Sequence, residues 1–192
     1  MLSIMNAALL AQGQQEIVSE NDGSMEYRLM ARNWPGIVEA ELEDGAYRYS
    51  KQEAHLVSRQ PGKFDFADGY LVPDAALHVR QVWLQSDSGQ RHELTWTQDA
   101  TCVYLNNSDG CWIEYVVCPE PDLWGANFVR GVQKRMEAVI SRAIKEEFSE
   151  AEALDSAAEM YFQRARTISS KSRSGKPFYK KGPIASARMR RG

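Results

Sequence analysis

The spacing of the apolar residues changes twice along this sequence, from helical to alternating and back to helical. Apolar side chains recur at roughly helical spacing in residues 24–44, whereas residues 77–84 and 92–97 mostly alternate between apolar and polar. Helical spacing returns from Trp124 onward. The sequence therefore predicts an α+β protein: an α-helical bundle of about four helices with an inserted small antiparallel β-sheet, followed by an extended C-terminal tail.

The helices are predicted from their apolar stripes and their end signals. Ser3 is expected to cap the first helix, and Ser149 with Glu152 to form a capping box at the start of the last. The Pro35-Gly36 pair predicts a kink or a break in the second helix. The predicted helices span residues 3–12, 24–44, 120–148 and 149–168.

The third predicted helix carries an apolar residue at every fourth position. At 3.6 residues per turn such a stripe winds around the helix, so more than one neighbouring element is needed to cover it. The last helix instead has a 4-3-4-3 spacing typical of bundle helices. The two stripes are Trp124, Phe128, Val132, Met136, Ile140, Ile144 and Phe148, and Leu154, Ala158, Tyr161, Ala165 and Ile168.

The β insertion is predicted to occupy residues 46–118. Its last two strands, residues 101–105 and 111–117, are separated by a loop rich in Asn, Asp and Gly. Because that composition favours a tight reversal of the chain, the two strands are expected to form a hairpin.

Charge is divided unevenly along the chain. The formal net charge is −3, yet the last acidic residue is Glu159, and residues 160–192 hold ten Lys and Arg with no acid, which leaves −13 for residues 1–159. We therefore divide the chain into a folded domain, residues 1–170, and a flexible basic docking tail, residues 171–192. Such a tail has too little apolar surface to fold alone and is expected to order on a partner. The alternative is a solvated end without a partner.

The residues expected to make this contact combine positive charge with one aromatic pair. The basic side chains would pair with acidic groups of the partner, and the aromatic rings would supply apolar anchoring. These predicted docking residues are Lys171, Arg173, Lys176, Phe178, Tyr179, Lys180, Lys181, Arg188, Arg190 and Arg191.

No residue pattern indicates an enzyme, a metal site or a cofactor site. The three histidines, His55, His78 and His92, lie far apart in strand-like segments, and no Gly-x-Ser-x-Gly, metal-ligand or phosphate-loop spacing is present. The three cysteines are an odd number and are expected to be reduced, in an intracellular setting. No apolar run approaches the roughly 18 residues of a membrane span, so we expect a soluble protein without a membrane partner.

Aromatic residues in the strand region leave a nucleic-acid interpretation open, because bases stack on such side chains. Few basic residues accompany them, however, and residues 1–159 are acidic as a whole. Core packing is therefore the favoured role for this group, which comprises Trp83, Trp96, Tyr104, Trp112 and Tyr115.

Five stretches, taken in order, carry a resemblance to a known family. Tyr47 and Tyr49 occupy the aromatic places of a "W-x-F/Y-A" strand, His78 stands where Arg is common in "y-x-L-P-x-D-x-L-R-V", and Ile184 takes the Trp position of a closing "W-x-x-A-R". The chain resembles the head-to-tail adaptor (connector or neck) proteins of tailed bacteriophages, the tail tubular protein A or gatekeeper group. The stretches are residues 6–13, 34–56, 66–79, 112–128 and 182–188.

The resemblance implies a structural virion protein of the phage neck, present in the host cytoplasm during assembly. Proteins of this family form a ring, usually dodecameric, under the portal protein, close the DNA-filled head and provide the attachment platform for a downstream nozzle or stopper protein. Packaged DNA passes through the ring without sequence-specific binding, and the C-terminal segments reach the portal. Two alternatives stay open: another neck or tail component, such as a stopper or tail terminator, and a nucleic-acid-binding protein that uses the basic tail.

Overall fold

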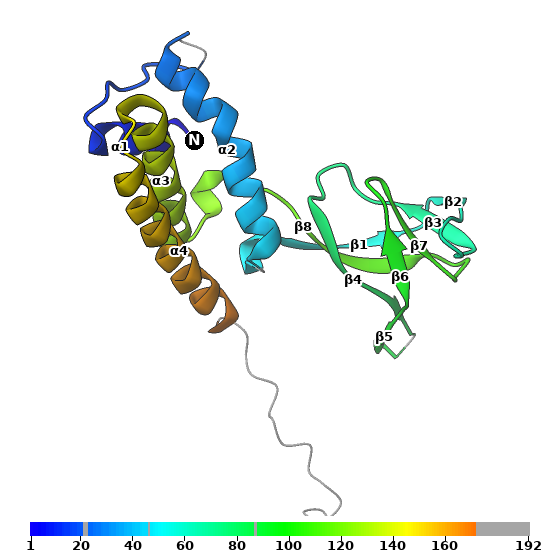
Figure 1. The fold of residues 1–192 in the computed structure, drawn as a ribbon. Coiled ribbons are helices and arrows are strands. Elements are labelled where there is room, and N and C mark those ends of the chain that lie inside the picture. The colour runs from blue at the N-terminus through cyan, green and yellow to red at the C-terminus, as the bar shows by residue number, and fades with distance from the viewer. Residues whose placement is uncertain (21–22, 46, 87, 172–192) are drawn as a thin grey trace, which may run out of the picture.

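The computed structural model describes residues 1–20, 23–45, 47–86 and 88–171 (Figure 1). These residues form a mixed helical and strand structure with four α-helices and two small antiparallel sheets, which confirms the predicted α+β class. The helices lie together in one part of the molecule and the sheets in the other. The helices are α1 (Leu2–Ala11), α2 (Met25–Asp44), α3 (Ala126–Ile140) and α4 (Phe148–Lys171).

Helix α3 lies at the centre of the helical part and contacts α1, α2 and α4. This agrees with the expectation that its winding stripe needs more than one neighbour. The largest buried side chains of this core include Tyr47, Phe128 and Phe162, and the ring of Phe128 packs against Tyr47, Tyr49, Trp124 and Phe162.

Two of the predicted helix caps are wrong. Ser3 lies inside α1, whose N-cap is Met1, and Ser149 lies inside the first turn of α4 because that helix already begins at Phe148. Ser24 does cap α2, where its hydroxyl accepts a hydrogen bond from the Tyr27 amide at 3.0 Å. Helix α2 also continues through Pro35 without a break, so local propensity is overridden there by the packing of α2 on α3.

The predicted single helix over residues 120–148 is wrong, because the structure divides it. Trp124 precedes α3, which ends at Ile140, and a π-helical turn, η3 (Ser141–Lys145), follows. Glu146 then takes a left-handed conformation with φ 57°, and the Ser141 hydroxyl donates a hydrogen bond to the Glu147 carbonyl at 3.0 Å. The chain reverses at this point and α4 returns along α3.

The predicted apolar face of α4 is correct in part. Ala158 and Ala165 are buried against α3, but Ile168 is 58% exposed. Phe162, which was not assigned to that face, is buried and lies between Ala158 and Ala165 in the sequence. The helix also extends past the predicted end at residue 168, to Lys171.

The strand region contains two four-stranded antiparallel sheets where one small sheet was predicted. Their strand orders are β1-β8-β4-β5 and β2-β3-β7-β6. The strands are β1 (Lys51–Leu56), β2 (Arg59–Pro61), β3 (Asp68–Leu71), β4 (His78–Gln85), β5 (Arg91–Glu93), β6 (Trp96–Gln98), β7 (Cys102–Leu105) and β8 (Cys111–Val116).

The predicted hairpin between residues 101–105 and 111–117 is wrong, because β7 and β8 belong to different sheets. The loop between them does turn tightly, and Gly110 has φ 89°. Tyr70 of the second sheet fixes the loop: its hydroxyl donates to the Asn107 carbonyl and accepts from the Gly110 amide. The alternating segment of residues 92–97 is likewise divided between two strands: β5 belongs to the first sheet and β6 to the second.

The chain enters and leaves the strand region at adjacent points. After α2 and a short 3-10 turn, η1 (Arg48–Ser50), it continues into β1, which pairs with β8 from Lys51–Val116 to Leu56–Cys111. The Val117 amide then donates to the Ser50 carbonyl at 2.8 Å, before η2 (Pro121–Leu123) leads to α3. In the part of the chain that the structure describes, no helix combines the length and the apolar composition needed to cross a membrane.

Candidate functional site

Of the predicted docking residues, the structure describes only Lys171, which is exposed in the last turn of α4. The other nine lie outside the described residues: Arg173, Lys176, Phe178, Tyr179, Lys180, Lys181, Arg188, Arg190 and Arg191. The structure therefore locates the point from which the basic segment continues.

That point lies beside the C-terminal end of α2. The hydroxyl of Ser169 accepts a hydrogen bond from the Arg48 amide at 2.9 Å, and the guanidinium of Arg166 holds both carboxylate oxygens of Glu41, with the Nη2 atom 2.9 and 2.8 Å away. The ends of two helices that are far apart in sequence are thus joined by direct contacts.

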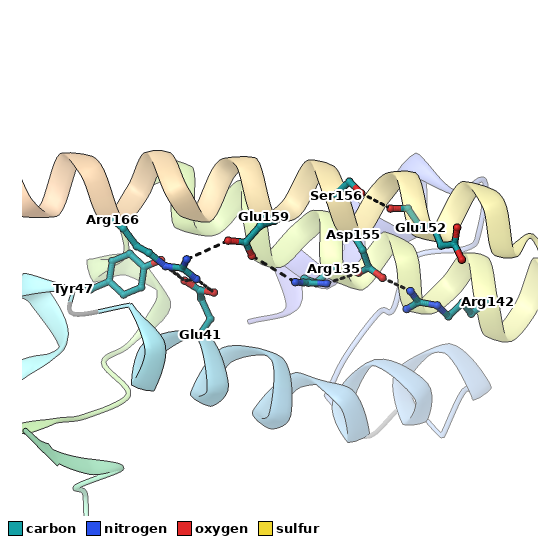
Figure 2. Close-up of polar contacts among 9 residues, drawn as sticks. All are labelled: Glu41, Tyr47, Arg135, Arg142, Glu152, Asp155, Ser156, Glu159 and Arg166. Carbon is teal, nitrogen blue, oxygen red and sulfur yellow. Dashed lines mark hydrogen bonds and ion pairs between the residues drawn. The ribbon is translucent and has the colours of Figure 1, made fainter.

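From Glu41 an alternating series of ion pairs runs between the helices (Figure 2). Arg166 bonds Glu159 at 3.1 Å, Glu159 lies 3.8 Å from Arg135, and Arg135 bonds Asp155 at 2.8 Å. Arg142 pairs with the other oxygen of Asp155. We call this series the charge ladder; its members are Glu41, Arg135, Arg142, Asp155, Glu159 and Arg166.

The Glu41 end of the ladder is the buried end. Burial raises the pKa of Glu41 above its ordinary value of 4.5, although hydrogen bonds from Tyr47 and Arg166 and the Arg166 charge oppose that shift. The Tyr47 hydroxyl donates to Glu41, and burial together with the carboxylate raises the pKa of Tyr47. The ring can lie there because residue 45 is a glycine: a Cβ on Gly45 would meet the Tyr47 ring at 2.1 Å.

The ladder lines a groove of about 410 Å³ between α2 and the α3–α4 pair. Its remaining walls are Gly36, Ile37, Ala40, Asp44, Val139 and Phe162. The carboxylate of Asp44 is exposed and has no ion pair or hydrogen bond within the described residues. We call this feature the α2–α4 groove. Because a helix C-terminus carries partial negative charge, an unpaired acid in the last turn of α2 favours a cationic neighbour.

Sequence reasoning did not find the ladder. Its one available signal was Glu41, an acid between the apolar positions Val38 and Leu42 on the buried side of α2. A carboxylate at such a position needs a cation from elsewhere in the chain. Its partner Arg166 lies 125 residues away, and the sequence does not indicate that pairing.

A second hollow, of about 330 Å³, lies in the strand region beside Trp112. His55 stacks on the Trp112 ring with centroids 4.9 Å apart, and His92 also lines the hollow. All three histidines are exposed. Within the described residues, no three His, Cys, Asp or Glu side chains gather as a metal ion would require.

The aromatic residues of the strand region serve mainly in packing, as expected. Trp83, Tyr104 and Tyr115 are buried, while Trp96 and Trp112 are half-buried. The guanidinium of Arg91 lies 4.2 Å from the Trp83 ring centroid, which covers this tryptophan from solvent and leaves no open stacking platform on it. All three cysteines carry free thiols, with Cys102 and Cys111 buried and Cys118 exposed.

Comparison with known proteins gave no relative: no protein-family model and no curated protein matches the sequence.

Proposed function

We propose that this chain is a head-to-tail adaptor of a tailed bacteriophage, a non-enzymatic structural protein of the virion neck. In this proposal copies of the chain form a ring under the portal protein, close the DNA-filled head and offer the attachment platform for the next tail component. The four helices act as the bundle of the subunit, and the two sheets between α2 and α3 are its insertion.

The observation that carries the proposal is the order of elements combined with the distribution of charge. Two helices, a strand region and two further helices are followed by a C-terminal segment, residues 172–192, with seven basic and no acidic residues. That segment follows Lys171, which is exposed at the end of α4, so it can reach a partner without passing through the core. Basic segments with few apolar residues characteristically order on a partner.

Co-sedimentation with portal rings encoded by the same genome tests the proposal. We expect the full-length chain to saturate the rings near one copy per portal subunit, and a chain truncated after Ser170 to remain in the supernatant. The double substitution Phe178→Ala and Tyr179→Ala should weaken binding. The matched control is Phe148→Ala, because Phe148 is an exposed aromatic residue at the N-terminal end of α4, the end opposite Lys171.

Failure of both chain lengths to bind would reject the portal-adaptor assignment. A chain that instead sediments only with the assembled neck would be a stopper or tail terminator. A chain that binds DNA with an affinity falling steeply with salt would be a nucleic-acid-binding protein, because such binding releases condensed counterions.

A further inference from the structure

The α2–α4 groove combines an apolar strip with an excess of negative charge. Ile37, Ala40 and Val139 contribute apolar surface that is not fully buried. The same lining holds four carboxylates and three guanidinium groups. Asp44 is the carboxylate that no described cation neutralises, and it lies at the end of α2.

The basic segment begins beside this end of the groove. Arg166 lines the groove and bonds Glu41, and Ser169, one turn further on, bonds the Arg48 amide. Residues 172–192 follow with seven basic side chains, no acid, and Phe178-Tyr179 as the aromatic pair. The segment therefore has the charge and the apolar side chains that complement the groove.

The distances allow the segment to fold back along α4. From Lys171 back to Phe162 is nine residues of helix, or about 14 Å at 1.5 Å per residue. From Lys171 forward to Phe178 is seven residues of chain, which span at most about 24 Å when extended. The aromatic pair can thus reach the middle of the groove, while Arg173 and Lys176 pass its end near Asp44.

We propose that residues 172–192 dock into the α2–α4 groove of the same chain. Basic side chains of the segment pair with Asp44, and Phe178-Tyr179 cover Ile37, Ala40 and Val139. A segment tethered this closely has an effective concentration in the millimolar range, which favours its own groove over that of a second copy. The inference does not depend on the adaptor assignment. Where both hold, the groove and the portal compete for residues 172–192, so this segment of the free chain stays in the groove until a portal is present.

Trypsin cleavage of the isolated full-length chain tests the docking. Cleavage after Lys181 is followed by mass spectrometry. It should be about tenfold slower in the chain than in a synthetic peptide of residues 172–192. The reason is that the millimolar effective concentration of the tethered segment exceeds a weak Kd of the segment for the groove by about that factor. Ala40→Trp fills the groove and should return the rate to within about twofold of the peptide. Ala153→Trp is the matched control, because Ala153 is also an exposed helical alanine but lies outside the groove lining.

A charge variant provides a second measurement that does not depend on filling the groove. Asp44→Asn should raise the cleavage rate about threefold at low salt, whereas Glu43→Gln, an exposed neighbour outside the lining, should leave it unchanged. Circular dichroism of each variant is the check that it is folded.

Three results would overturn the inference. Wild-type cleavage at the peptide rate means that the segment is not docked. Equal rates for Ala40→Trp and Ala153→Trp mean that it is docked elsewhere, and protection that grows with protein concentration assigns the groove to a second copy. Because no portal is present in these digestions, their outcome is independent of the co-sedimentation result.

Discussion

Replacing Arg166 with methionine tests the energetics of the charge ladder. The substitution keeps an unbranched, largely apolar stem and removes the guanidinium that holds both oxygens of Glu41. The carboxylate of Glu41 would then stay buried, with the Tyr47 hydroxyl as its remaining hydrogen-bond donor. We therefore expect Arg166→Met to destabilise the fold substantially.

The size of the effect follows from the exposure of the two partners. Removing one partner of a fully buried ion pair costs about 3–5 kcal/mol, because the other charge is left without compensation. The Glu41 side chain is 9% exposed and the Arg166 side chain 33%, so solvent screens part of this interaction. We expect a loss of about 2–3 kcal/mol at pH 7, of which Glu41→Gln in the same chain should restore about 1–2 kcal/mol.

The loss should depend on pH in a defined direction. Burial already raises the pKa of Glu41 above 4.5, and removing Arg166 removes two influences that lower it. In the variant, the folded state therefore binds a proton more readily than the unfolded state. Because stability falls with rising pH wherever the folded state binds more protons, the deficit of Arg166→Met should be largest at pH 7 and shrink as the pH falls toward 4.5.

Urea unfolding followed by circular dichroism at pH 7 and pH 5 measures these differences. Arg164→Met is the matched control, because Arg164 lies on the exposed side of the same helix, over the Tyr161 ring, and should cost at most about 0.5 kcal/mol. The reasoning is refuted if the two methionine variants are equally stable, or if adding Glu41→Gln does not recover stability.

Two further predictions concern packing and thiol accessibility. Gly131→Ala should lower stability by about 1–3 kcal/mol in thermal unfolding, because its Cβ would lie 2.4 Å from the Phe162 ring, whereas Gly36→Ala, with no atom within 4 Å, should stabilise α2 by up to about 1 kcal/mol; equal effects would contradict the tight α3–α4 contact. A thiol reagent at pH 8 should modify Cys118 alone in the native chain and all three cysteines in denaturant, because burial raises the pKa of Cys111 to about 12; rapid native labelling of Cys111 would contradict its burial.

The helices could be predicted where their signals are local. The predicted second helix, residues 24–44, differs from α2 (Met25–Asp44) by one residue, and the apolar spacing after Trp124 identified α3 and α4. The third helix was predicted to end at residue 148, eight residues after α3 ends at Ile140, because the periodic stripe continues through Ile144 to Phe148. The helix is ended by the π-helical turn and the left-handed Glu146, and a glutamate gives no sign of a left-handed conformation.

The pairing of the strands was less predictable than their existence. The loop before Cys111 has hairpin composition, but composition says only that the chain turns there. The loop is held by Tyr70, which lies 40 residues before Gly110 in the sequence and bonds the loop from the sheet that contains β3 and β7. The Glu41–Arg166 contact is also non-local, so both features depend on tertiary packing that local sequence patterns do not contain.

The hydrogen bond between Val117 and Ser50 has a consequence for how such a protein can diversify. Because the chain leaves the helical part and returns to it at neighbouring positions, the distance that the helices must bridge does not depend on what lies between. Residues 51–116 can therefore gain strands, lose them or be exchanged for another module during evolution. The C-terminal end of α2 and the segment before α3 would keep their separation.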